Sequence, residues 1–144
     1  MEIIRRKAEK HMKIGFTGCG NMGSAMMRGI IASGKCAAEN IMASDTLPEA
    51  LRSRKEELGI LTATDNREVA EFAEVLFLSI KPQYYQEVIA QIRNLDLQEK
   101  IIVTIAPGKT LKWLEEEFEK PVKIIRTMPN TPAMVGEGMM GMCP

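Results

Sequence analysis

The sequence has no excess of either charge and no long apolar run. Nineteen basic side chains balance nineteen acidic ones, so the formal net charge is zero. Surfaces that bind nucleic acids or membranes are usually basic, and this balance gives no support for either partner. No apolar run approaches the roughly 18–20 residues that a membrane-spanning helix needs. We therefore expect no nucleic-acid partner and no membrane partner.

Cysteine and histidine are scarce. The three cysteines, Cys19, Cys36 and Cys143, are an odd number without metal-ligand spacing, so we expect neither a disulfide framework nor a metal site. This usage favours a reducing, cytoplasmic compartment. The single histidine, His11, lies in a basic leader, and we expect it to take no part in catalysis.

Length and composition predict one globular domain. The 144 residues are 45% hydrophobic and 26% charged, close to the average for soluble domains. Residues 1–11 carry four basic and two acidic side chains but lack the apolar region of a secretory signal. We interpret residues 1–11 as an N-terminal extension and assign residues 12–144 to the domain.

Short apolar strands alternate with helical patterns along this domain. Strands are expected at 13–17, 40–44, 61–64, 75–80, 100–105 and 122–126, with a seventh at 138–142. Helices are expected at 24–33, 46–58, 65–73, 84–92 and from 110 onward. Such alternation predicts right-handed βαβ crossovers. The expected fold class is α/β, a doubly wound, mostly parallel Rossmann-type sheet with helices on both faces.

Several helix ends carry typical capping residues. Thr46 and Glu49 form a capping-box pattern, and Asp65 and Thr110 stand where further helix N-termini are expected. Gly34 and Gly59 stand where helices should end in a left-handed residue.

A glycine-rich motif stands between the first strand and the first helix. It fits G-x-G-x-x-G and consists of Gly18, Cys19, Gly20, Asn21, Met22 and Gly23. The first glycine permits a tight turn, the second lets a pyrophosphate approach the backbone, and the third lets helix and strand pack closely. The context predicts dinucleotide binding; the alternative is a tight turn without a ligand. We expect no catalysis by the Cys19 thiol, because this position tolerates any small residue.

The end of the second strand bears on the choice of cofactor. Asp45 lies 45 − 23 = 22 residues past Gly23, close to the roughly 20 expected for an acid that binds a ribose 2′-hydroxyl. A carboxylate there favours NADH, because it repels the 2′-phosphate of NADPH. Arg52 and Arg54 either reach such a phosphate or lie on a solvated helix face. The sequence therefore leaves both NADPH and NADH open.

Further distinctive loops follow later strands. They are Ser79-Ile80-Lys81-Pro82, Ala106-Pro107-Gly108 and Met128-Pro129-Asn130-Thr131-Pro132-Ala133. Together with the glycine motif, these loops resemble pyrroline-5-carboxylate reductases. The resemblance extends from Met12 to Pro144, and its most specific part is M-P-N-T-P-A followed by V-G-E-G.

The resemblance implies a reaction and an assembly. Members of this family reduce 1-pyrroline-5-carboxylate to proline, the last step of proline biosynthesis, by hydride transfer from NADPH or NADH. They continue as a helical domain that forms a homo-dimer or higher homo-oligomer and contacts the substrate carboxylate. The chain is therefore expected to be the cofactor domain of such an enzyme, inactive on its own.

The resemblance also implies which residues bind the cofactor. The motif at 18–23 would hold the pyrophosphate, and Ser44 and Asn66 would lie on the adenosine side, next to Asp45, which the spacing predicts there. The cleft and nicotinamide side would be lined by Ser79, Ile80, Lys81, Pro82, Ala106, Pro107, Gly108, Asn130 and Thr131.

One loop departs from the family pattern, and the catalytic residue stays unassigned. The family usually has A-A-G where this chain has Ala106-Pro107-Gly108, and Pro107 removes a backbone N–H. No catalytic residue is assigned; Lys81 and Glu137 are the nearest ionisable candidates, and Lys81 is expected to act on the loop or through its charge. The alternative functions are a nucleotide-sensing regulatory domain and the cofactor domain of another imine or hydroxy-acid dehydrogenase.

Overall fold

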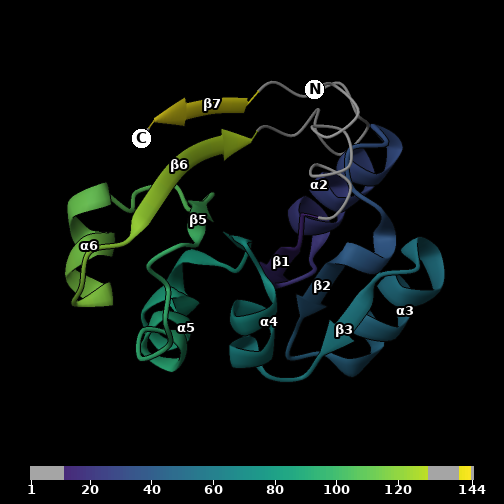
Figure 1. The fold of residues 1–144 in the computed structure, drawn as a ribbon, viewed down its shortest axis with the longest axis horizontal. Coiled ribbons are helices and arrows are strands. Elements are labelled where there is room, and N and C mark those ends of the chain that lie inside the picture. Colours follow the sequence, from purple (N-terminus) through teal and green to yellow (C-terminus); the bar gives the residue numbers. More distant parts are fainter. Residues whose placement is uncertain (1–11, 130–139, 144) are drawn as a thin grey trace.

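The computed structural model describes residues 12–129 and 140–143. Their seven strands form one sheet in the order β3-β2-β1-β4-β5-β6-β7 (Figure 1). The strands are β1 (Ile14–Thr17), β2 (Ile41–Ser44), β3 (Leu61–Ala63), β4 (Val75–Leu78), β5 (Ile101–Thr104), β6 (Lys123–Pro129) and β7 (Met140–Cys143). Strands β1 to β6 are parallel in the order 3-2-1-4-5-6, and β7 runs antiparallel to β6. The predicted doubly wound α/β fold is confirmed.

Helices connect the parallel strands. The α-helices are α2 (Asn21–Ala32), α3 (Pro48–Leu58), α4 (Asn66–Phe72), α5 (Tyr85–Ile92) and α6 (Leu111–Phe118). Two short 3-10 turns, η1 (Ala38–Asn40) and η2 (Pro82–Tyr84), precede β2 and α5. The helices lie on both faces of the sheet, as Figure 1 shows.

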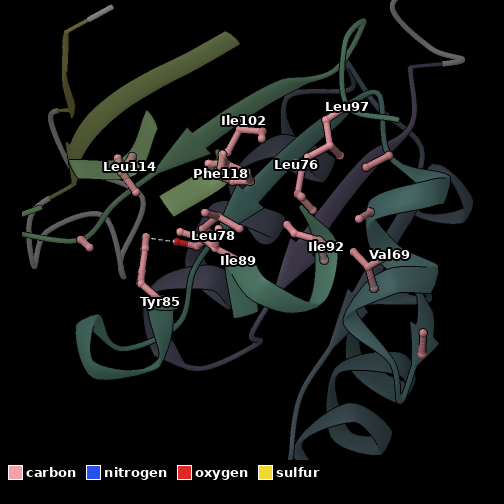
Figure 2. Packing of buried hydrophobic residues seen from close by; sticks show 14 residues of the cluster. Val69, Leu76, Leu78, Tyr85, Ile89, Ile92, Leu97, Ile102, Leu114 and Phe118 are labelled. Carbon is pink, nitrogen blue, oxygen red and sulfur yellow. Dashed lines mark hydrogen bonds between the residues drawn. The ribbon is translucent and has the colours of Figure 1, made fainter. Parts of the chain in front are cut away.

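Two hydrophobic clusters form the core, one on each face. Helices α4, α5 and α6 pack on one face with Leu76 and Leu78 of β4 (Figure 2). Helices α2 and α3 pack on the other face, where the rings of Phe16 and Phe77 stack with centroids 4.7 Å apart. Because successive strand residues point to opposite faces, Phe77 and its neighbours on β4 serve different clusters.

Strand register aligns the ends that carry the site. Thr17 of β1 pairs with Ser44 of β2 and with Leu78 of β4, and Leu78 pairs with Thr104 of β5. The loops after these four strands therefore leave one edge of the sheet together. Ligands of doubly wound sheets bind at this carboxyl edge.

Most predicted helix ends are confirmed, and two predictions are wrong. The carboxylate of Asp65 and the hydroxyl of Thr110 accept N–H groups at the starts of α4 and α6. Helix α2 begins at Asn21 rather than at residue 24, because Gly20 already has the extended backbone of an N-cap. The capping box at Thr46 does not form: Leu47 is the N-cap of α3 and has no side-chain cap.

Candidate dinucleotide-binding site

The three glycines of the loop after β1 have different surroundings. Gly18 has φ +97°, and a Cβ there would lie 2.7 Å from the carbonyl oxygen of Ser79. A Cβ at Gly23 would lie 2.9 Å from the carbonyl oxygen of Gly18. Gly20 has an ordinary φ of −70°, and a Cβ there would meet no described atom within 4 Å. The fold thus requires glycine at 18 and 23, whereas at Gly20 it leaves open space that a ligand can use.

Hydrogen bonds hold the glycine loop from both sides. The N–H of Gly18 donates to the carbonyl of Ser44 in β2 at 2.7 Å. The hydroxyl of Ser79, which follows β4, donates to the carbonyl of Gly18 at 2.7 Å. Within the loop, the hydroxyl of Ser24 donates to the carbonyl of Cys19 at 2.8 Å. The loop shape is therefore set by β2, β4 and α2.

The N-terminus of α2 is built to receive an anion. Its N-cap is Gly20, and no side chain of the described residues caps this helix. The first turn contains no acidic residue. Asn21 is exposed, while Met22 packs against the core on the α2 face. Free N–H groups and the helix dipole favour a phosphate at such an end, and the open space at Gly20 fits a pyrophosphate.

Asp45 contacts the glycine loop directly. Its Oδ2 accepts the backbone N–H of Cys19 at 3.0 Å, and its Oδ1 accepts the N–H of Leu47 at 3.0 Å. The second contact fixes the backbone just before α3, where Leu47 is the N-cap, so Thr46 lies one residue too early to cap the helix. Each carboxylate oxygen can accept more than one hydrogen bond, so the predicted ribose contact stays a prediction.

The thiol of Cys19 is buried beside this carboxylate. Burial, the charge of Asp45 and the hydrogen bond from the thiol to Asp45 together raise the pKa of Cys19 from 9.0 to about 12. The charge of Arg54 lowers this pKa, but it is the smallest of these effects. Since the thiolate is the nucleophile, this environment disfavours chemistry at Cys19.

A chain of polar side chains lies on the adenosine side of the predicted site. The buried hydroxyl of Ser44 donates to Oδ1 of Asn66 at 2.6 Å. The amide nitrogen of Asn66 donates to Oε1 of Gln91 at 2.7 Å. The structure thus brings Ser44, Asp45 and Asn66 to the carboxyl ends of β2 and β3. Gln91 had no place in the sequence prediction, because its distance along the chain conceals this contact.

The two arginines after β2 differ. Arg52 pairs with Glu49 at 3.2 Å, and its side chain is largely exposed. Arg54 pairs with Glu57 at 2.6 Å and is mostly buried. Glu57 also pairs with Arg28, which joins α2 to α3. Arg52 therefore lies on a solvated helix face. Arg54 forms part of the contact between α2 and α3, near Cys19.

The remaining predicted residues follow β4 and β5. Ser79 and Ile80 are partly buried, whereas Lys81 is exposed. Ala106 is buried, and the exposed Gly108 has φ +79°. Beneath these loops the buried hydroxyl of Tyr85 bonds to both strands, a contact that no sequence motif announced. Asn130, Thr131 and Glu137 lie outside the described residues.

The sequence of this chain matches a known protein family. The family described as "NADP oxidoreductase coenzyme F420-dependent" matches residues 13–108, two thirds of the chain. The chain belongs to this family. The matched segment contains the glycine loop, Asp45, Asn66 and the two described loops that the sequence predicts for the nicotinamide side, at 79–82 and 106–108.

The chain is also similar to curated pyrroline-5-carboxylate reductases. It is 37% identical over 135 residues to the reductase of Methanosarcina acetivorans, covering 94% of this chain and 50% of that protein. It is 39% identical over 132 residues to the reductase of Escherichia coli, covering 92% of this chain and 49% of that protein. The chain spans about half the length of these relatives. The resemblance inferred from the loops is confirmed.

The chain is also similar to solved structures of pyrroline-5-carboxylate reductases. A pyrroline-5-carboxylate reductase from Coxiella burnetii superposes with a TM-score of 0.87 at 32% identity, over 92% of this chain and 49% of that one. The reductase of Plasmodium falciparum, solved with NADP bound, gives 0.81 at 30% identity, over 93% and 48%. More distant dehydrogenases, such as a 3-hydroxyisobutyrate dehydrogenase of Mycobacterium tuberculosis at 14% identity, share the fold.

Within residues 12–129 and 140–143, no helix combines the length and apolarity needed to cross a bilayer. The same ranges contain no group of three or more His, Cys, Asp or Glu residues arranged to hold a metal ion.

Proposed function

We propose that this chain binds NADPH or NADH and forms the cofactor-binding part of a pyrroline-5-carboxylate reductase. The observation that supports this most is the 37–39% identity to curated reductases across more than nine tenths of the chain. The open space at Gly20 and the uncapped start of α2 supply the physical basis for holding a pyrophosphate. The NADP seen in the Plasmodium falciparum relative supports the same ligand class here.

Each part of the site has a task in this proposal. The backbone of residues 18–23 holds the pyrophosphate at the start of α2. Ser44, Asp45 and Asn66 bind the adenosine ribose and its substituent. Ser79 to Pro82 and Ala106 to Gly108 enclose the nicotinamide, together with Asn130 and Thr131. Pro107 takes part through shape alone, because it has no N–H to donate.

The chemistry needs positioning more than reactive side chains. When bound, the reduced cofactor supplies the hydride that converts the C=N carbon of 1-pyrroline-5-carboxylate into the corresponding C–H of proline. The chain's own residues orient the cofactor and exclude water from it. The exposed charge of Lys81 lies at the end of β4 and attracts an anionic substrate.

The proposal extends to the whole protein. Residues 12–144 form the dinucleotide-binding domain, and residues 1–11 form an extension. A helical domain supplies the contacts to the substrate carboxylate and assembles the enzyme as a homo-dimer or higher homo-oligomer. The buried free thiols of Cys19 and Cys36 support a reducing, cytoplasmic compartment.

The cofactor part of the proposal is tested by titration. Purified chain is titrated with NADPH and NADH, and binding is followed by calorimetry and by the fluorescence of the reduced nicotinamide. We expect saturable binding of at least one of the two. A chain that is folded by circular dichroism and binds neither would contradict the proposal.

The substrate part is tested with a chimera. The half of the Escherichia coli reductase that this chain matches is replaced by the chain, and oxidation of NADPH is measured with 1-pyrroline-5-carboxylate and with methylmalonate semialdehyde, the aldehyde whose reduction gives 3-hydroxyisobutyrate. We expect turnover of the cyclic imine only. The chain alone should turn over more than about tenfold more slowly than the chimera, because it does not hold the substrate in place. Preference of the chimera for the semialdehyde would favour a hydroxy-acid dehydrogenase instead.

A further inference from the structure

Tyr85 is the largest fully buried side chain of the described core, and its hydroxyl is surrounded by polar partners. It is the first residue of α5 and has no exposed surface. Its hydroxyl donates to the carbonyl of Leu78 at 2.6 Å, the bond drawn as a dashed line in Figure 2. It accepts the hydroxyl of Thr104 at 2.9 Å and the backbone N–H of Ile105 at 3.3 Å.

These partners belong to two neighbouring strands. Leu78 is the last residue of β4, and Thr104 is the last residue of β5. The same line of contacts reaches β6, because the hydroxyl of Thr127 donates to the carbonyl of Thr104 at 3.2 Å. A single phenol therefore fixes the ends of β4 and β5 relative to each other, and Thr127, within β6, adds a contact from the next strand.

The phenol is suited to a fixed position. Burial raises the pKa of Tyr85 above its ordinary value of 10.0, so the hydroxyl keeps the proton that it donates to Leu78. A hydroxyl with one donated and two accepted hydrogen bonds is fully satisfied. Removing it leaves a buried carbonyl and a buried hydroxyl without this partner, and the strand ends lose their common contact.

The loops that follow β4 and β5 lie where one half of a dinucleotide is expected to bind. In doubly wound sheets a dinucleotide lies across the point where the strand order reverses, here between β1 and β4. The glycine loop and the end of β2 take the pyrophosphate and the adenosine half. The ends of β4 and β5 therefore take the nicotinamide half, through the loops that begin at Ser79 and Ile105.

We propose that the hydroxyl of Tyr85 positions the two loops that hold the nicotinamide half of the cofactor, because it joins the ends of β4 and β5 directly beneath them. This inference rests on the proposed function. Tyr85 is a positioning residue and acts through the backbone of residues 78–80 and 104–106. The glycine loop shares Ser79 with the first of these segments, but it is also held by Ser44 of β2 and Ser24 of α2, which the hydroxyl does not contact.

The experiment compares a ligand with and without nicotinamide. Wild-type chain and Tyr85→Phe are each titrated with NADPH and with 2′-phospho-ADP-ribose, which keeps the adenosine and pyrophosphate but lacks nicotinamide. Phenylalanine fills the same volume, so the core stays packed. We expect NADPH to bind about three- to tenfold more weakly to Tyr85→Phe, the effect of one lost hydrogen bond, with 2′-phospho-ADP-ribose unchanged. The emission shift of bound NADPH should also decrease.

Two matched variants complete the experiment. Tyr84→Phe removes the hydroxyl of the neighbouring tyrosine, which is 50% exposed. It should leave the affinity for both ligands unchanged. Thr104→Val removes the hydroxyl that donates to Tyr85 while keeping the branched shape. If Tyr85→Phe does not fold, Thr104→Val should show the same result, weaker binding of NADPH with unchanged binding of 2′-phospho-ADP-ribose.

The remaining outcomes overturn the proposal. Equal weakening of both ligands would make the hydroxyl a general structural contact. Unchanged binding of NADPH by Tyr85→Phe and by Thr104→Val would show that the hydroxyl of Tyr85 does not position the nicotinamide loops. Wild-type chain that binds neither ligand would contradict the proposed function itself, and with it this role of Tyr85.

Discussion

The carboxylate of Asp45 accepts the backbone N–H of Cys19, with 3.0 Å between Oδ2 and the nitrogen. The residue at the end of β2 is thereby tied to the loop that follows β1, and its other oxygen holds the N–H of Leu47 at the start of α3. An acid at this position is usually considered only for its contact with the ribose. Here it also shapes the loop, so a substitution at Asp45 has two separable effects.

The charge of Asp45 should lower the affinity for NADPH. Asp45→Asn keeps a carbonyl oxygen that can accept the N–H of Cys19 but removes the charge. We expect the ratio of NADPH to NADH affinity to rise by about fivefold, corresponding to about 1 kcal/mol for one charge at a partly exposed site. Calorimetric titration with both cofactors measures this ratio.

Asp96→Asn is the matched control for this measurement. Asp96 also accepts the N–H of the residue two positions on, Gln98, but lies in the loop between α5 and β5. Its substitution should leave the ratio unchanged. If Asp45→Asn also leaves the ratio unchanged, the carboxylate does not face the 2′ position, and Arg54 becomes the residue to examine.

A side chain at position 20 should block binding without harming the fold. Gly20 has an ordinary φ and open space around its Cβ position, so Gly20→Val has only a ligand to collide with. Thermal unfolding should be nearly unchanged, whereas binding of NADPH and NADH should be lost. Gly29→Val serves as the control, because a Cβ at Gly29 also meets no described atom within 4 Å but lies on the exposed side of α2. Equal binding by both variants would contradict the pyrophosphate assignment.

Gly15, in β1, should be a glycine on which stability depends strongly. A Cβ there would lie 2.7 Å from Cγ1 of Val69 and 2.8 Å from Cβ of Ala73, where α4 crosses the strand. Gly15→Ala should therefore lower the free energy of unfolding by about 1–3 kcal/mol through overpacking. Urea denaturation of Gly15→Ala and of Gly20→Ala compares the crowded and the open position. Similar stabilities for the two variants would show that α4 can move away from β1.

The buried thiol of Cys19 should be unreactive and sensitive to alkali. Because its pKa is raised from 9.0 to about 12, the folded state holds the proton more tightly than the unfolded state. This contribution to stability is complete below pH 9 and is lost progressively as the pH rises toward 12. In a Cys36→Ala, Cys143→Ala background, a thiol reagent at neutral pH should modify Cys19 only after unfolding. Rapid modification of the folded protein would contradict the burial of this thiol.

A further substitution checks the alkaline effect. Cys19→Ala should make the free energy of unfolding fall less steeply between neutral pH and a pH above 9.0. Denaturant titrations at the two pH values measure the difference. An identical loss in both proteins would assign the alkaline sensitivity to other groups, of which Tyr85, also with a raised pKa, is the first to test.

Local signals allowed much of the fold to be predicted. The alternation of strands and helices predicted the doubly wound sheet, and Asp65 and Thr110 marked helix starts because capping depends on residues two or three positions apart. The Thr46 prediction failed because α3 begins one residue later than the pattern indicates, with Leu47 as its N-cap. A capping pattern describes residue preferences and does not reveal at which of two adjacent residues the helix begins.

Contacts between distant segments could not be predicted in this way. The positions of Leu78, Tyr85 and Thr104 carry no motif, and their hydrogen bonds exist only because register brings two strand ends level. Gly15 likewise looks like any small strand residue until α4 is placed against it. The glycine motif and Asp45 were identified from spacing, but the bond from Cys19 to Asp45 required the structure.

Gly18 is held through its N–H by Ser44 and through its carbonyl by the hydroxyl of Ser79. A loop that must become ordered around a ligand loses conformational entropy in doing so, and the loss weakens binding. At Gly18 that entropy is already lost when the sheet folds, where burial of the strands offsets it. We therefore expect Gly18 to keep this conformation when a phosphate arrives, and the rate of association to depend on the encounter and not on a slow rearrangement of the loop.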